Sequence, residues 1–277
     1  MFLEGMTGVG LFRALLLGLL QGLTEFLPVS SSGHLVLVPW LLGWRDPGLT
    51  YDAIVHLGTL VAVIIYLWED VARLIEGAWQ AVLSRSLQSA SSRLALLILV
   101  SALPGAILGY ALEGFFERIF GSVAAVVGFL MVTGFLIVLS ERLGQGARRV
   151  KEMNVGDALL IGLAQACAIA PGISRSGATI SVGLLRRLDR EEATRFAFLM
   201  SIPIIVGATG YKLFSLLAEA ATAVNLLPLG IGFVAAFLGG YLAIGGLLRH
   251  VRSRSLRPFA YYCWAVGVLS LLLFLIR

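Results

Sequence analysis

The chain carries one unusual segment twice, ALLLGLLQGLTEFLPVSSSG at residues 14–33 and ALLIGLAQACAIAPGISRSG at residues 158–177. The copies lie 144 positions apart without a gap, and nine of their 20 residue pairs are identical. Each copy is an apolar run that ends in a turn of proline, glycine and serine, and a second short apolar run follows. Turns of this kind cannot face lipid, because their backbone groups need hydrogen-bond partners. The segments therefore predict two re-entrant helical hairpins that build one shared polar site.

The composition places the chain among membrane proteins. Of its 277 residues, 58% are hydrophobic and only 13% are charged, which is too apolar for a soluble protein of this length. The net charge of +5 comes from cations spread over separate short loops, so we expect no nucleic-acid partner. Cys167 and Cys263 lie in apolar runs without a CxxC motif and indicate neither a metal site nor a disulfide.

Six apolar runs are long enough to span a bilayer, whereas four shorter runs fit the halves of the two hairpins. The spanning runs are roughly residues 53–68, 94–112, 119–140, 196–215, 226–248 and 259–276, and the shorter runs are 11–27, 34–44, 156–170 and 178–188. Arginine and lysine are concentrated in the loops 69–93, 141–155, 186–195 and 249–257, which the positive-inside rule places in the cytoplasm. The first hairpin then enters from outside, the second enters from the cytoplasm, and both termini are external.

This topology predicts an all-α polytopic integral membrane protein with an inverted-topology repeat. Each half contains one re-entrant helical hairpin plus three transmembrane helices, and the odd number of spans inverts the second half relative to the first. We expect a single membrane domain, residues 1–277, made of the inverted repeats 1–140 and 141–277.

The first hairpin concentrates groups that can do chemistry. Gln21 and Glu25 are four residues apart and share a helical face, and Ser30 and His34 repeat that spacing after the proline. An ionisable group at membrane depth is costly unless it is paired or solvated, so Glu25 is a functional candidate. Gln21 is either an interhelical hydrogen-bonding residue or part of the site. An imidazole such as His34 can transfer a proton or attack phosphorus, while the serines can cap the second half-helix, bind substrate, or do both.

The second hairpin predicts a phosphate site. Its turn, PGISRSGAT at residues 171–179, opens a half-helix, whose backbone N–H groups and positive end attract anions. Arg175 adds a planar fork that suits phosphate, although it could instead form a structural ion pair with Glu25. The expected phosphate-binding residues are Ser31 and Ser32 of the first turn and Gly172, Ser174, Ser176, Gly177 and Thr179 of the second.

The runs QGLTEFLPVSSSGH and PGISRSGAT, together with the chain length, resemble the undecaprenyl pyrophosphate phosphatase family of bacterial membrane enzymes associated with bacitracin resistance. The resemblance implies hydrolysis of undecaprenyl diphosphate to undecaprenyl phosphate and inorganic phosphate, which recycles the lipid carrier for peptidoglycan synthesis. It also implies two interdigitated inverted repeats in the cytoplasmic membrane, a site open to the outer face, and dependence on Mg²⁺ or Ca²⁺. The sequence does not decide whether the protein forms a homodimer.

The family's motif residues fall on named positions of this chain. Its essential glutamate falls on Glu25, and the Glu or Gln four residues earlier falls on Gln21. The family's serine falls on Ser30 or Ser31, its histidine on His34 and its arginine on Arg175. A further pattern resembles residues 51–59, which makes Asp52 and His56 weaker candidates, with an interfacial helix start as the alternative.

The mechanistic hypothesis follows from charge. Arg175, the turn's N–H groups and a divalent cation held partly by Glu25 would neutralise the diphosphate. His34 or Ser30 would then attack the terminal phosphorus, or His34 would activate a water that does. The alternative function is a polyprenyl-phosphate transporter or flippase with the same anion-binding loops, because broken helices in inverted repeats also build transport sites.

Overall fold

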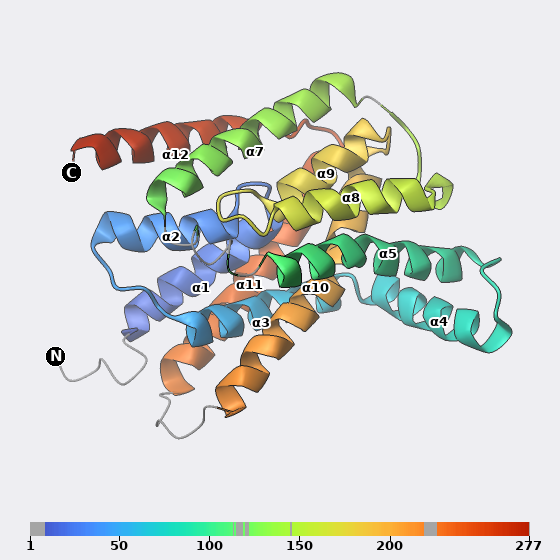
Figure 1. Ribbon diagram of the computed structural model, residues 1–277, viewed down its shortest axis with the longest axis horizontal. Helices are drawn as coiled ribbons and strands as arrows, with labels where there is room; N and C mark the ends of the chain where they lie inside the picture. The colour runs from blue at the N-terminus through green and yellow to red at the C-terminus, as the bar shows by residue number, and fades with distance from the viewer. Residues whose placement is uncertain are drawn as a thin grey trace.

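The computed structural model describes residues 9–112, 114, 119, 122–144, 146–218 and 226–276, and for residues 212–218 it describes the backbone alone. Among these residues the structure is helical, and the one pairing of β type is an isolated bridge between Arg148 and Leu188. The helices are α1 (Leu11–Phe26), α2 (Ser31–Leu42), α3 (Leu49–Tyr66), α4 (Trp68–Ser84), α5 (Ala90–Ala111), α7 (Val123–Leu143), α8 (Val155–Cys167), α9 (Arg175–Leu185), α10 (Arg190–Ala218), α11 (Leu226–Val251) and α12 (Arg257–Ile276) (Figure 1).

Six of the described helices, α3, α5, α7, α10, α11 and α12, are long and apolar enough to cross a membrane. This confirms the prediction of an all-α, multi-pass membrane protein, and each span lies within a few residues of the predicted run. Four spans begin earlier than their apolar runs, and in two of them, α5 and α10, a polar residue caps the start of the helix. The Ser89 side chain accepts a hydrogen bond from Ser92 N–H at the start of α5, and Asp189 accepts one from Glu191 N–H at the start of α10.

The duplicated segments form the pairs α1–α2 and α8–α9, each with a short turn between its helices. In both turns the serine at the equivalent position caps the second helix: Ser30 accepts a hydrogen bond from Gly33 N–H at 3.2 Å, and Ser174 accepts one from Gly177 N–H at 3.0 Å. Ser30 adopts a φ of +68° and Gly172 a φ of +101°, a left-handed backbone that Gly172 adopts without a Cβ penalty. The two turns lie side by side in the centre of the molecule (Figure 1), where Ser176 Oγ donates a hydrogen bond to Leu27 O.

The contacts between helices follow the duplication. Helix α1 packs along α11, and its counterpart α8 packs along α5. Helix α11 also packs against α3, as α5 does against α10, and the last spans of the two predicted halves, α7 and α12, pack against each other. Each hairpin therefore lies against a span of the other half. This pattern agrees with interdigitated repeats, although the inverted repeats 1–140 and 141–277 themselves stay a prediction.

Glycine at the equivalent positions 18 and 162 allows these close helix contacts, and a substitution there tests the packing. A Cβ on Gly18 would come within 2.5 Å of Gly232 O and 2.9 Å of the Ala235 side chain. Gly18→Ala is therefore expected to lower the free energy of unfolding by about 1–3 kcal/mol, because α1 must move away from α11. Gly207→Ala is the matched control, since a Cβ at this helical glycine would meet nothing within 4 Å. Thermal unfolding in detergent measures both, and an equal melting temperature for the two variants would contradict the packing account.

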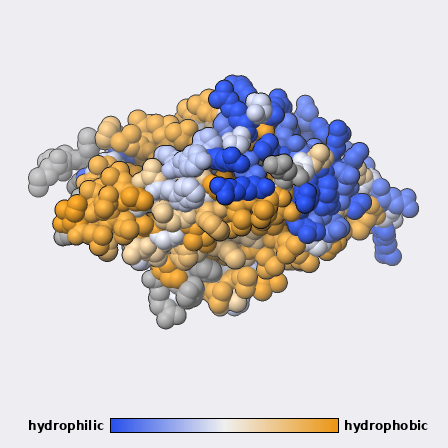
Figure 2. Space-filling view, turned by 90° about the horizontal axis from the view of Figure 1, so that it is seen from above, coloured by the Kyte–Doolittle hydropathy of each residue, from blue (hydrophilic) through white to orange (hydrophobic). Residues whose placement is uncertain are grey.

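Charged side chains gather at one end of the molecule, and Figure 2 shows the hydrophilic surface there and a hydrophobic surface over much of the rest of that face. Buried acids pair with arginines from the loops predicted to be cytoplasmic. Asp157 bonds to Arg148 at 2.9 Å and to Arg186 at 2.6 Å, and Glu141 accepts hydrogen bonds from Nε and Nη2 of Arg190. Helix α1 begins and helix α12 ends at the opposite end (Figure 1), while the terminal residues 1–8 and 277 lie outside the described residues.

Candidate active site

A cavity of about 310 Å³ lies where the two hairpins meet α3, α5 and α10. Its polar lining contains Glu25, Ser31, Ser32, His56, Gln165, Ser174, Arg175 and Thr209. The remaining lining is apolar and comes largely from α8, α10 and the second turn. Another cavity, of about 240 Å³, lies at the charged end beside Glu141 and Arg190, whose charges already satisfy one another. The hairpin cavity is therefore the candidate active site.

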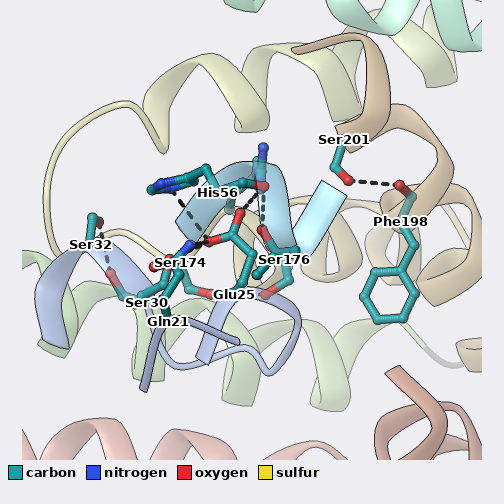
Figure 3. Close-up of polar contacts among 12 residues, drawn as sticks. Gln21, Glu25, Ser30, Ser32, His56, Ser174, Ser176, Phe198 and Ser201 are labelled. Carbon is teal, nitrogen blue, oxygen red and sulfur yellow. Dashed lines mark hydrogen bonds and ion pairs between the residues drawn. The ribbon is translucent and has the colours of Figure 1, made fainter. Parts of the chain in front are cut away.

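Glu25 connects the two hairpins at this cavity. It lies in the last turn of α1 and is only 6% exposed. One carboxylate oxygen forms an ion pair with Arg175 Nη2. The other accepts hydrogen bonds from Ser31 Oγ at 2.5 Å and from Gln21 Nε2 at 2.9 Å, and lies 3.9 Å from His56 Nε2 (Figure 3). Groups from both copies of the duplicated segment thus contact one buried carboxylate.

Arg175 is the first residue of α9, and its side chain is 20% exposed, so it reaches the cavity while its backbone begins a helix. The ion pair of Arg175 with Glu25, which was the alternative to phosphate binding, is present. It does not prevent phosphate binding, because a guanidinium has five N–H donors. An anion in the cavity would meet both this fork and the N-terminal end of α9.

The predicted phosphate-binding residues divide into two groups. Ser31, Ser32 and Ser174 line the cavity. The others stabilise the second turn. Ser176 Oγ donates a hydrogen bond to Leu27 O, and Thr179 Oγ1 donates one to Arg175 O at 2.8 Å. Gly177 N–H donates to Ser174 Oγ. Gly172 belongs to this structural group, since its carbonyl accepts from Thr133 Oγ1 and its N–H bonds to Ser32 Oγ at 3.5 Å.

His34 lies beside the cavity but does not line it, and both of its ring nitrogens have structural partners. Its Nδ1 donates to Ser30 O at 2.8 Å, so the neutral ring accepts from Tyr262 OH through Nε2, also at 2.8 Å. The two rings stack with centroids 5.6 Å apart. This histidine is only 3% exposed. Its contacts with Tyr262 hold α2 against α12.

His56, the weaker sequence candidate, is the histidine that faces the cavity. Its Nδ1 donates to Asp52 O at 2.7 Å, and this bond directs Nε2 toward the Glu25 carboxylate. Asp52 itself lies in the first turn of α3 and does not line the cavity. Asp52 precedes His56 by one helical turn, so its carbonyl can accept the hydrogen bond that orients the imidazole.

The remaining catalytic candidates, Ser30 and Gln21, do not line the cavity. Ser30 is 2% exposed and its hydroxyl caps α2, whereas Gln21 is fully buried and bonds to Glu25. Sequence reasoning missed Gln165 as a site residue, although its identity with Gln21 in the duplication was a usable signal.

The described residues contain no group of three or more His, Cys, Asp or Glu side chains that could hold a metal ion by themselves. Glu25 is the one carboxylate among the described residues that line the cavity. The other oxygen ligands there are hydroxyl and amide groups. Such a site fits Mg²⁺, which often takes only one or two carboxylates and completes its shell with substrate phosphate and water.

Comparisons with known proteins identify the family. A protein-family model described as bacitracin resistance protein BacA matches residues 14–269. The undecaprenyl-diphosphatase of Rubrobacter xylanophilus is 47% identical over 96% of this chain and 99% of that protein. Those of Pelobacter propionicus and Halothermothrix orenii are each 43% identical, over 94% and 95% of this chain and 95% and 98% of the relatives. The matched range contains the second hairpin, nearly all of the first, five of the six spans and most of α12, so this chain belongs to the bacitracin resistance protein BacA family.

Proposed function

We propose that this protein hydrolyses undecaprenyl diphosphate to undecaprenyl phosphate and inorganic phosphate. The observation that carries the proposal is the contact of Ser31 and Arg175 with one buried carboxylate, Glu25, in a cavity between the hairpins. The identity of the substrate is inferred from close relatives that are named undecaprenyl-diphosphatase. A flippase is not favoured, because a transport site needs anion-binding groups but has no use for a hydroxyl activated by a buried carboxylate.

Ser31 is the nucleophile that the geometry favours. Its hydroxyl donates to Glu25, which can accept the proton as Ser31 Oγ attacks the terminal phosphorus. The bond from that phosphorus to the bridging oxygen breaks, and undecaprenyl phosphate leaves with the bonding electrons. Once Glu25 has released that proton to solvent, it accepts a proton from a water molecule whose oxygen bonds to the phosphorus of the phosphoserine. The bond from phosphorus to Ser31 Oγ breaks, Glu25 returns the proton to Ser31 Oγ, and inorganic phosphate is released. Arg175 stabilises the charge on the terminal phosphate oxygens in both steps.

A divalent cation, Mg²⁺ or Ca²⁺, is proposed to bind together with the substrate. Glu25 and the cavity hydroxyls of Ser31 and Ser32 would hold it, along with oxygens of the diphosphate. When bound, the ion neutralises phosphate charge and so makes the phosphorus easier to attack. Gln21 is an amide that donates a hydrogen bond to Glu25. It cannot supply a second carboxylate, so a mechanism in which two carboxylates bind one metal ion does not fit this site.

The surroundings of the cavity suit a lipid substrate. Its apolar wall includes Ile169, Ile173, Ile204 and Ile205, which can contact the first isoprene units of the prenyl chain. We place the protein in the bacterial cytoplasmic membrane with its site open to the outer face and both termini external. The hydrophilic surface at one end of the molecule (Figure 2), together with the arginines that pair with Asp157 and Glu141, supports this orientation. Whether a homodimer forms stays an open prediction.

Phosphate release from undecaprenyl diphosphate by detergent-purified protein with Mg²⁺ tests the proposal directly. Purified wild type should release inorganic phosphate that depends on the cation. No release with Mg²⁺ or Ca²⁺ would overturn the proposal and favour transport.

Arg175→Lys tests whether the guanidinium fork binds phosphate. The variant keeps the charge near Glu25 but loses the planar pair of donors, so we expect kcat/KM to fall about 10- to 100-fold. Arg190→Lys is the matched control, because Arg190 likewise pairs with a buried glutamate, Glu141, but lies away from the hairpin cavity. Equal activity of Arg175→Lys and wild type would show that Arg175 serves only as a counter-ion.

A further inference from the structure

Gln165 is a buried side chain with no partner at the edge of the cavity. It lies on α8, is 2% exposed and belongs to the cavity lining. Neither its Nε2 nor its Oε1 has a hydrogen-bond partner among the described residues. Buried amides are nearly always hydrogen-bonded, because removing them from water without a partner is costly. This amide therefore calls for a ligand that enters the cavity.

The duplication shows how Gln165 lost its partner. Its counterpart Gln21 donates to Glu25, four residues later on the same helix. The residue four positions after Gln165 is Ile169, which cannot accept a hydrogen bond. The second copy thus keeps the glutamine but not its acceptor, and Ile169 also lines the cavity. A glutamine kept only for packing would have no reason to stay polar in such surroundings.

The position of Gln165 indicates which part of the substrate it meets. Ser31, Glu25 and Arg175 take the terminal phosphate in the proposed reaction, and the apolar wall takes the prenyl chain. Gln165 stands on that wall among Ala168, Ile169 and Ile204. The phosphate that carries the lipid must lie between the terminal phosphate and the chain, so it is the group that comes within reach of this amide.

We propose that Gln165 is a substrate-binding residue whose Nε2–H₂ group donates a hydrogen bond to a non-bridging oxygen of the lipid-linked phosphate. This inference rests on the proposed function and adds to it the recognition of the leaving group. Negative charge grows on that phosphate as the bridging bond breaks, and a fixed amide donor stabilises it there. Because the donor is neutral, it adds no charge that would retain the monophosphate product.

Gln165→Met tests the inference, since methionine has a similar length and shape but no donor. We expect kcat/KM for phosphate release from a prenyl diphosphate to fall about 10- to 100-fold, as for the loss of a hydrogen bond to a charged group. The melting temperature without ligand should stay the same or rise, because the substitution removes an unsatisfied buried group. Ser181→Ala is the matched control: Ser181 Oγ is also buried without a partner among the described residues, but it does not line the cavity. Its activity should equal that of wild type.

A binding measurement separates this inference from the proposed function. A non-hydrolysable prenyl methylenediphosphonate should raise the melting temperature of wild type and Ser181→Ala, and raise that of Gln165→Met much less. If wild type released no phosphate, the proposed function would fail, whereas this binding comparison would still decide the role of Gln165. Equal turnover and equal ligand stabilisation in Gln165→Met would overturn the inference. So would a lower melting temperature of the ligand-free variant, because it would show that Gln165 acts in packing.

Discussion

Ser31→Ala is expected to lower the rate of phosphate release about 1000-fold or more while the protein stays folded. The Ser31 hydroxyl lines the cavity and donates to Glu25, so its removal takes away the nucleophile without leaving a large void. Phosphate release under saturating substrate, with thermal unfolding measured in parallel, checks both parts of the expectation.

Ser30→Ala is the neighbouring control. Its hydroxyl caps α2 and does not line the cavity, so the variant should lose about 1 kcal/mol of stability and retain most of its activity per folded molecule. The reverse result, an inactive Ser30→Ala and an active Ser31→Ala, would assign the nucleophile to the capping serine and contradict the proposed mechanism.

Glu25→Gln is expected to reduce turnover about 100- to 10,000-fold, the range for loss of a general base. The amide has the size of the carboxylate but accepts no proton from Ser31 at neutral pH. It also leaves Arg175 without its anionic partner, and some loss of stability is expected because an unpaired buried charge is costly.

Glu141→Gln separates these two effects. Glu141 is likewise buried and paired with an arginine, Arg190, but it lies at the charged end of the molecule. Its variant should lose stability and keep normal turnover per folded molecule. If Glu25→Gln lost no more activity than Glu141→Gln, Glu25 would be a structural residue.

Much of the fold could be predicted because the chain encodes it locally. Spans in a bilayer need long apolar runs, and each of the six runs became a helix with nearly the expected bounds. The hairpins followed from the two broken apolar segments for the same reason. The early starts of α5 and α10 could not be predicted from hydropathy, since Ser89 and Asp189 extend those helices into polar sequence by capping them.

The candidate site was harder to predict, because a motif gives residue types and spacing but not the direction of side chains. His34 and His56 illustrate the difference: each donates to the carbonyl four residues earlier, yet one ring turns toward Tyr262 and the other toward Glu25. Which way each ring points depends on the neighbouring helix, and this is long-range information. Gln165 was missed for the same reason: the duplication marks the residue, but the sequence does not show that its unpaired amide lies at the cavity.

The most direct test of the central claim uses undecaprenyl diphosphate labelled with ³²P in its terminal phosphate, in liposomes that contain the purified protein and Mg²⁺. The account predicts that wild type releases the label as inorganic phosphate and leaves unlabelled undecaprenyl phosphate in the membrane, and that Glu25→Gln does so far more slowly. Label that stays on the lipid while the lipid crosses the bilayer would contradict hydrolysis and identify a transporter.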